Sequence, residues 1–102
     1  MSLSTLSVLN ALLADPGAEL YGLDIAHRTD LTPGTIYLIL LRLRQAGWVR
    51  DRWEDVDPRH ERRPCRHYYQ LTELGAVQAR EAVGAAQKQL SRAMPVTLTG
   101  LA

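Results

Sequence analysis

The chain has 102 residues, and its hydrophobic content of 46% is typical of one folded domain with a modest core. Such a length leaves little room for a catalytic cleft, so a binding module is the first expectation. The longest purely apolar run, residues 36–41, is far below the roughly 20 residues of a membrane span, and the N-terminus lacks a signal-peptide pattern. The single cysteine, Cys65, cannot close an internal disulfide, although it leaves an intermolecular bridge open. These features predict a soluble, intracellular protein.

The net charge of +1 conceals an uneven distribution of charge along the chain. Residues 1–41 carry one arginine against four acids, whereas residues 42–66 carry eight arginines against five acids. Arginine suits bidentate contacts with phosphate or guanine, so the second segment is the expected face for nucleic acid. A second interpretation stays open, in which this segment is a solvated hairpin whose own acids balance its bases.

Two helices are expected before the first strongly basic segment. Ser4 can cap the first helix, and the Asp-Pro-Gly sequence at residues 15–17 ends it. Its leucines recur at spacings of three and four, the period of a helix with one buried face: Leu6, Leu9, Leu12 and Leu13. The second helix covers residues 20–29, and its inward-facing side chains are Leu23, Ile25 and Ala26. Residues 30–31 then form the short turn of a helix-turn-helix.

A third helix is expected to begin at Thr32, whose hydroxyl can accept a hydrogen bond from a backbone N–H two or three residues later. Pro33 suits the first helical position, and Gly47 suits the position just beyond the C-terminus. The core stripe of this helix comprises Ile36, Ile39, Leu40 and Leu43. The opposite face comprises Tyr37, Leu38, Leu41, Arg42 and Gln45.

Leu38 and Leu41 are unusual on this second face, because a helix that faces DNA or solvent is normally polar there. Three interpretations stay open. The two leucines touch thymine methyl groups, or they pack on another part of the protein or a partner subunit, or the whole helix is buried in the core.

Residues 49–54 and 67–71 are expected to form two strands, because their aromatic residues favour a pleated, half-buried surface. The connection between them, residues 55–65, is too long and too polar for a tight turn, which predicts a mobile tip. A helix-turn-helix followed by a basic hairpin predicts a winged helix-turn-helix DNA-binding domain over residues 1–72. The arginines expected to contact DNA from the hairpin are Arg59, Arg62, Arg63 and Arg66. The DNA-binding residues expected on the third helix and its cap are Thr32, Gly34, Thr35, Tyr37, Leu38 and Arg42.

Thr72 can cap a last helix, and residues along this helix alternate spacings of three and four, as in a heptad seam. The seam comprises Ala76, Ala79, Val83, Ala86, Leu90 and Ala93. We expect residues 73–94 to form a C-terminal dimerisation helix through this seam, since so small a domain benefits from extra buried surface. Packing on the chain's own domain through Leu74 and Val77 is the alternative, and the two are compatible. Residues 95–102, which begin with proline, are expected to be a disordered tail.

Four segments carry a resemblance to a known family: residues 20–26, 31–37, 40–47 and 66–75. In this order and spacing they resemble the PadR family of bacterial transcriptional regulators. The resemblance implies a winged-helix homodimer that binds palindromic operator DNA, usually as a repressor, with the C-terminal helix exchanging contacts between subunits. The short segment that follows the wing is similar to the short-tailed branch of the family, which has one C-terminal helix.

The chain departs from the family pattern at two positions of the third helix. Members commonly have proline where Leu38 stands and a basic residue where Leu41 stands, which leaves fewer groups for base contacts. Some short-tailed relatives bind flat aromatic drugs between the dimer helices through a tryptophan, whereas residues 73–102 contain no aromatic residue. A drug pocket of that kind is not expected.

No nucleophile–base set or paired carboxylates lie on the expected rigid elements, so the chain is not expected to be an enzyme. His60, Cys65 and His67 lack a fourth ligand for structural zinc, so neither a metal nor a cofactor is expected. We predict a transcriptional regulator that acts as a homodimer on double-stranded DNA in the bacterial cytoplasm, at the nucleoid, without membrane contact and with any effector ligand unspecified. Two alternatives are a winged helix that docks a partner protein through Leu38 and Leu41, and a DNA-binding protein of plasmid or phage segregation.

Overall fold

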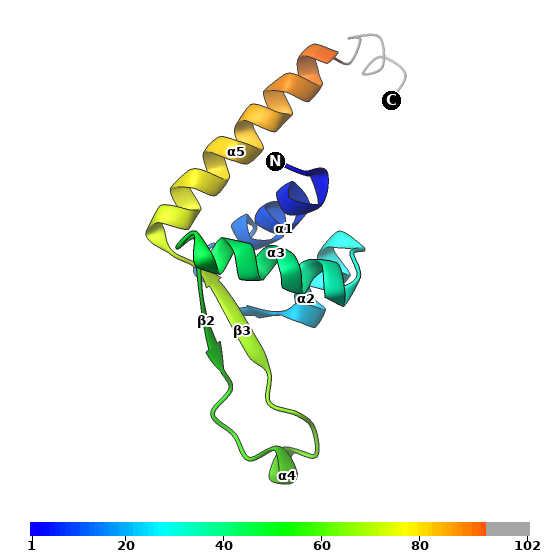
Figure 1. Cartoon of the computed structure of the whole chain (residues 1–102), viewed down its shortest axis with the longest axis vertical. Helices are drawn as coiled ribbons and strands as arrows, with labels where there is room; N and C mark the ends of the chain where they lie inside the picture. Colours follow the sequence, from blue (N-terminus) through cyan, green and yellow to red (C-terminus); the bar gives the residue numbers. More distant parts are fainter. Residues whose placement is uncertain (94–102) are drawn as a thin grey trace.

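The computed structural model describes residues 1–93, so the tail expected at residues 95–102 lies outside the described part. That part is mainly helical with a small antiparallel sheet, as predicted (Figure 1). The elements in chain order are α1 (Leu3–Leu13), β1 (Leu20–Tyr21), α2 (Gly22–Thr29), α3 (Pro33–Gln45), β2 (Val49–Trp53), α4 (Pro58–Glu61), β3 (His67–Leu71) and α5 (Glu73–Ala93). Helices α1, α2 and α3 gather around the sheet, while the β2–β3 hairpin and the far end of α5 project in opposite directions (Figure 1).

Helices α2 and α3 form the predicted helix-turn-helix. Thr32 caps α3 as expected, because its Oγ1 accepts a hydrogen bond from the Thr35 N–H at 3.4 Å, and Pro33 occupies the first turn. Beyond α3, Gly47 has a φ of +80°, in the left-handed region that favours glycine. Helix α2 ends at Asp30, whose φ of 58° is also left-handed, a conformation that a short polar side chain tolerates. Local signals therefore define the ends of α3.

Three predictions about the first two helices were wrong. The cap of α1 is Ser2 and not Ser4, which lies inside the helix. Helix α2 begins at Gly22, because the two residues before it pair with β3 as strand β1. Leu23 was expected to face inward, but its side chain is 52% exposed, whereas Ile25 is fully buried. Residues two apart lie about 200° apart around a helix, so these two side chains cannot share one buried face.

The predicted hairpin is present, and β1 adds a third strand to it in the order β1-β3-β2. Strands β2 and β3 pair from Val49 opposite Leu71 to Trp53 opposite His67. The long connection contains the short helix α4, which is capped by Asp57 through a 2.9 Å hydrogen bond from a backbone N–H two residues later. The hairpin thus carries a helical turn at its tip.

The core lies between the first three helices and the sheet. Its most deeply buried side chains are Val8, Leu9, Leu12, Ile25, Ile36 and Leu40. Burying a side chain of this kind contributes roughly 1.5–3 kcal/mol. The predicted core stripe of α3 is confirmed, while Tyr37 and Leu38 on its other side are 56% and 54% exposed. The structure therefore excludes the interpretation that α3 is buried all round.

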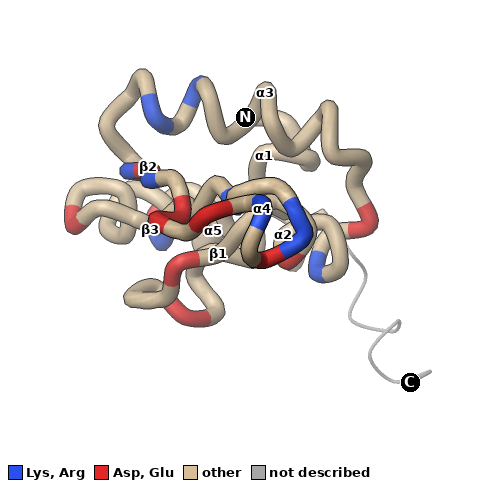
Figure 2. Tube along the Cα trace, turned by 90° about the horizontal axis from the view of Figure 1, so that it is seen from below, with Lys and Arg blue, Asp and Glu red and all other residues tan. Residues whose placement is uncertain are grey.

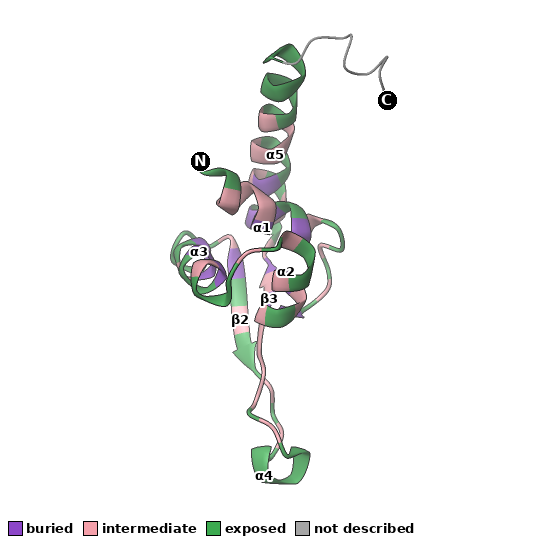
Figure 3. Ribbon diagram, turned by 90° about the vertical axis from the view of Figure 1, so that its right-hand side faces the viewer, coloured by how far each residue is buried: buried purple, intermediate pink, exposed green. Residues whose placement is uncertain are grey.

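Helix α5 starts against the junction between α3 and β2. Thr72 caps it as predicted, because its Oγ1 accepts a hydrogen bond from the Gly75 N–H at 2.9 Å. The Thr72 N–H also donates to the carbonyl oxygen of Trp48 at 3.0 Å. A Cβ atom at Gly75 would lie 1.8 Å from that same oxygen, so a side chain does not fit there. Helix α5 then passes α1 and continues beyond it, and its burial decreases toward the far end (Figure 3).

Candidate nucleic-acid interface

One face of α3 is uncovered beside the hairpin. Most residues predicted to contact DNA from this part of the chain are exposed: Thr32, Gly34, Tyr37, Leu38 and Arg42. Thr35 is half-buried, and its hydroxyl accepts a hydrogen bond from the Thr32 hydroxyl at 3.0 Å. Leu41, the second unusual leucine, is also half-buried. The face therefore combines hydroxyl, phenol, guanidinium and apolar groups, which can bind the hydrogen-bonding edges and thymine methyl groups that bases present in a major groove.

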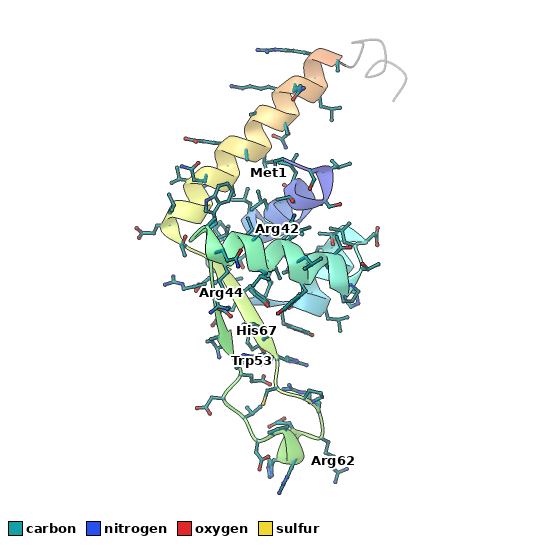
Figure 4. The ribbon with its side chains drawn as sticks, viewed as in Figure 1. Met1, Arg42, Arg44, Trp53, Arg62 and His67 are labelled. Atoms are coloured by element: carbon teal, nitrogen blue, oxygen red, sulfur yellow. The ribbon has the colours of Figure 1, made fainter. Side chains whose placement is uncertain are left out.

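The arginines of α3 and the wing differ in whether acids of the same chain bind them. Basic residues lie on the C-terminal half of α3 and around α4 (Figure 2). Within residues 1–93, Arg42, Arg59 and Arg62 form no salt bridge, and all three are exposed. Arg62 stands at the tip of the wing beside α4 (Figure 4). These three positive charges are available to phosphate oxygens.

Arg63, also predicted to contact DNA, is bound to an acid inside the wing. Its Nη1 and Nη2 lie 2.6 Å and 3.2 Å from the two carboxylate oxygens of Glu54. Glu54 also accepts a hydrogen bond from the Tyr68 hydroxyl at 3.2 Å. The bond from Arg63 is the main reason that the pKa of Glu54 falls to about 2, and burial opposes this effect. Arg63 therefore fastens the two sides of the wing together.

Arg66 and Arg52 lie at the base of the wing. The guanidinium of Arg66, a predicted DNA contact, stacks over the Tyr21 ring at 4.6 Å, which joins the wing to β1. Arg52 pairs with Glu19 through two hydrogen bonds and lies 4.9 Å from the centre of the Tyr68 ring. Both arginines thus hold the wing against the segment that leads into α2.

A chain of polar contacts links α3 to the wing, and the sequence analysis missed it. Arg44 Nε lies 3.1 Å from Asp51 Oδ1, and Asp51 Oδ2 lies 2.5 Å from His67 Nε2. The other ring nitrogen of His67, Nδ1, is 3.0 Å from the Tyr69 hydroxyl. The side chain of Arg44 reaches from α3 to the start of the wing, where His67 lies (Figure 4). One signal for these contacts was present in the sequence. His67 and Tyr69 are two residues apart on one strand, and Asp51 lies on the strand paired with it, so the three side chains share a face of the sheet.

Part of the predicted dimer seam on α5 packs against the core of the chain's own domain. Ala79 is completely buried in the core, so it offers no surface to a partner and its predicted role was wrong. Ala76 and Val83 are partly buried against the same core. The alternative packing through Leu74 and Val77 was also wrong, because these side chains are 52% and 48% exposed. Helix α5 meets its own domain along the alanine side.

The remainder of the seam borders an apolar groove between α1 and α5. The groove has a volume of about 490 Å³, and its apolar lining residues are Leu3, Leu6, Val83, Ala86, Leu90 and Ala93. Leu3 and Leu90 are 79% and 58% exposed. An exposed apolar surface of this kind is typical of an interaction site.

Within residues 1–93, no three His, Cys, Asp or Glu side chains form a group that could hold a metal ion. Of the zinc candidates considered, Cys65 donates its thiol to the Val56 carbonyl at 3.3 Å, and His67 is bound to Asp51. None of the helices in this range has the length and apolar character that crossing a membrane requires.

A helix-turn-helix with an uncovered α3 and a flanking basic hairpin defines a winged helix-turn-helix protein. Among solved structures, PcaV from Streptomyces coelicolor, a transcriptional regulator in complex with its natural ligand, has a TM-score of 0.69 and 24% identity, covering 99% of this chain and 68% of that one. BpsR from Bordetella bronchiseptica, whose DNA binding is regulated by 6-hydroxynicotinic acid, has a TM-score of 0.72 and 18% identity, covering 90% and 60%. A PadR-like transcription factor from Bacteroides fragilis has a TM-score of 0.67 and 24% identity, covering 96% and 88%. At these identities the likeness shows the fold, and the chain spans 60% of the length of the Bordetella regulator.

The family follows from the sequence profile. The profile of the transcriptional regulator PadR-like family matches residues 8–81, and the chain belongs to this family. No curated protein matches the sequence. The predicted resemblance is confirmed: the chain belongs to a family of transcriptional regulators and has the winged-helix fold.

Proposed function

We propose that the chain binds a palindromic operator as a homodimer, with preference for its sequence, and represses transcription there. The observation that carries this proposal is the uncovered face of α3 beside a wing whose tip presents exposed arginines that form no salt bridge within residues 1–93. A helix with exposed donors and apolar groups suits the major groove, and arginines on a hairpin suit phosphates or the minor groove. Repression is what the resemblance to the PadR family implies.

Each residue of the α3 surface has a separate part in this proposal. Tyr37 and Arg42 donate hydrogen bonds to base edges, while Leu38 touches a thymine methyl group. Backbone N–H groups at the start of the helix favour a phosphate. The residues that present this end to DNA are Thr32, Gly34 and Thr35.

The wing supplies affinity that does not depend on base sequence. Arg59 and Arg62, at the tip, neutralise phosphates, and each such contact adds to the salt dependence of binding. Arg66 lies closer to the body of the domain, where it can approach the same backbone from its position over Tyr21. Arg63 acts indirectly, because its pair with Glu54 keeps the two sides of the wing together.

A second copy of the chain covers the groove between α1 and α5 in this proposal. The exposed leucines of the groove would then leave water, with a gain of roughly 25 cal/mol for each Å² of apolar surface buried. A twofold axis makes the same patch meet itself and places two copies of α3 on one duplex. Two such helices reach successive major grooves about 34 Å apart, which requires a palindromic site.

Fluorescence anisotropy with labelled duplexes tests this function. One duplex carries the region upstream of the chain's own gene, and the other is a scrambled sequence of equal composition. We expect tighter binding to the first duplex at 100–200 mM salt, concentrations at which non-specific binding is weakened. Equal affinity for both duplexes would refute sequence-specific binding.

Two variants distinguish the contribution of α3 to DNA binding from that of the wing. Arg42→Ala should reduce the preference between duplexes. The double variant Arg59→Ala/Arg62→Ala removes four phosphate contacts from a dimer, so it should weaken both complexes alike and reduce the salt slope by about 4. Arg80→Ala is the matched control, because this exposed arginine of α5 forms no salt bridge within residues 1–93. A loss of affinity in Arg80→Ala equal to that of the wing variant would show that the effect comes from net charge alone.

A further inference from the structure

A second cavity lies between α3 and the base of the wing, away from the α1–α5 groove. Its volume is about 470 Å³, within the range of about 300–1,000 Å³ that is usual for small-molecule sites. The start of α2 and the first half of α3 form one side, and the hairpin forms the other. The aromatic residues that line it are Tyr21, Tyr37, Trp53, His67 and Tyr69.

These aromatic rings already form a partial stack. Trp53 and His67 have ring centres 4.3 Å apart and planes 15° from parallel, and His67 lies 4.5 Å from Tyr69. The outer member of the stack, Trp53, is 63% exposed. An indole that is fixed in orientation and uncovered on one side suits stacking by a further flat ring.

The charge of the cavity lining selects against anionic ligands. Among residues 1–93, no lysine or arginine lines the cavity, and the imidazole of His67 is bound to Asp51. Phosphate and carboxylate groups bind where cations or several N–H donors converge. The lining instead consists mainly of ring faces and aliphatic side chains, including Ile36 and Leu40 of α3.

The polar contacts of His67 leave one hydrogen-bonding group for a ligand. The Asp51 carboxylate is hydrogen-bonded to His67 Nε2, and the Tyr69 hydroxyl shares a hydrogen bond with His67 Nδ1. The Tyr69 oxygen keeps a lone pair that can accept a hydrogen bond from a ligand. Burial raises the pKa of Tyr69, so its hydroxyl retains its proton.

We propose that this cavity binds a flat, uncharged, two-ring aromatic compound with a hydroxyl group, which stacks on Trp53 and donates a hydrogen bond to Tyr69. This site is separate from the space between dimer helices. Tyr37 lines the cavity and also belongs to the α3 face directed toward DNA, so a bound ligand opposes DNA binding. This last step rests on the function proposed above, whereas the binding site itself does not.

Calorimetry and NMR on the full chain test the site with 2-naphthol as the probe. The chain has two tryptophans, and only Trp53 lines the cavity. The indole N–H signal of Trp53 should shift on addition of 2-naphthol, while that of Trp48 stays in place. Decahydro-2-naphthol, which has the same hydroxyl but no flat ring, should bind at least ten-fold more weakly. Equal shifts of both indole signals would overturn the proposal.

Substitutions at exposed positions test the stacking surface without disturbing the fold. Trp53→Ala should weaken 2-naphthol binding about ten-fold or more, and Trp53→Phe should retain most of it. Arg50→Ala is the matched control, because the exposed Arg50 lies on the same strand as Trp53 but on its opposite face, beside Gln70 of β3. A loss in Arg50→Ala as large as that in Trp53→Ala would overturn the proposed site.

The coupling to DNA is measured separately by titrating 2-naphthol into the chain bound to its upstream duplex. Release of the duplex by the wild type, and not by Trp53→Ala, supports the proposal. If 2-naphthol binds at Trp53 but leaves DNA affinity unchanged, the regulatory step is refuted while the site stands. If the chain binds no duplex, the proposed function fails, and the calorimetric result still decides the cavity.

Discussion

Gly75 gives the sharpest test of how α5 is positioned. A Cβ atom at this residue would lie 1.8 Å, 2.6 Å and 2.8 Å from the O, C and Cα atoms of Trp48, all of which are backbone. Because no flexible side chain can move aside, Gly75→Ala must displace α5 and lengthen the 3.0 Å hydrogen bond from the Thr72 N–H to Trp48. Overpacking costs about 1–3 kcal/mol and the lost hydrogen bond about 0.5–1.5 kcal/mol, so we expect a loss of about 2–4 kcal/mol.

Thermal unfolding at matched protein concentration measures this loss. For a domain of this size each kcal/mol lowers Tm by about 4–8 °C, so Gly75→Ala should melt roughly 10–30 °C below the wild type. Gly84→Ala is the control on the same helix, because nothing lies within 4 Å of its added Cβ. It should gain about 0.8–1 kcal/mol from helix propensity. A Gly75→Ala protein as stable as the wild type would refute the close contact between α5 and Trp48.

Three further predictions concern the dimer, the wing and the start of α3. Ala86→Glu places a charge in the groove between α1 and α5, so sedimentation should show a folded monomer with reduced operator affinity; a mutant that stays dimeric would place the interface elsewhere. Glu54 has a folded pKa of about 2, below its ordinary 4.5, so its pair with Arg63 stabilises the wing above pH 4.5 and is lost as the pH falls toward 2. The stability difference between wild type and Glu54→Gln in urea should follow this pH range, and a difference that does not change with pH would contradict the assignment. Thr32→Ala should cost about 1 kcal/mol of stability through loss of the α3 cap, and an unchanged urea midpoint would show that the cap contributes nothing.

The winged-helix class was predictable because its signals are local or periodic. The cap at Thr32 and the glycine at Gly47 lie within one turn of the helix ends that they define. The buried stripe of α3 follows from spacing along a single helix. Which side chains lie opposite the stripe follows from the same geometry, whereas their exposure was decided by the structure.

Contacts between distant segments were the part that the sequence analysis missed. Strand β1 is two residues long and pairs with β3 far along the chain, so its residues resembled the start of α2. The pairing of Arg63 with Glu54 depends on how the two sides of the wing meet. Nothing in the sequence distinguished Arg63 from the other wing arginines, so all four were expected to contact DNA. The aromatic cavity forms only when the hairpin folds beside α3.

The sequence by itself determined the four longer helices, the hairpin, the core face of α3, the basic wing and the family. Each depends on propensities, spacings and motifs that act over a few residues or recur in a known order. Only the tertiary structure decided which residues of the seam are buried within the chain's own domain, as Ala79 is. It also decided that Gly75 must lack a side chain, because the atom that excludes a Cβ there belongs to Trp48, on a different element. Burial and close approach depend on which segments meet in space, and no spacing along the chain encodes that distance.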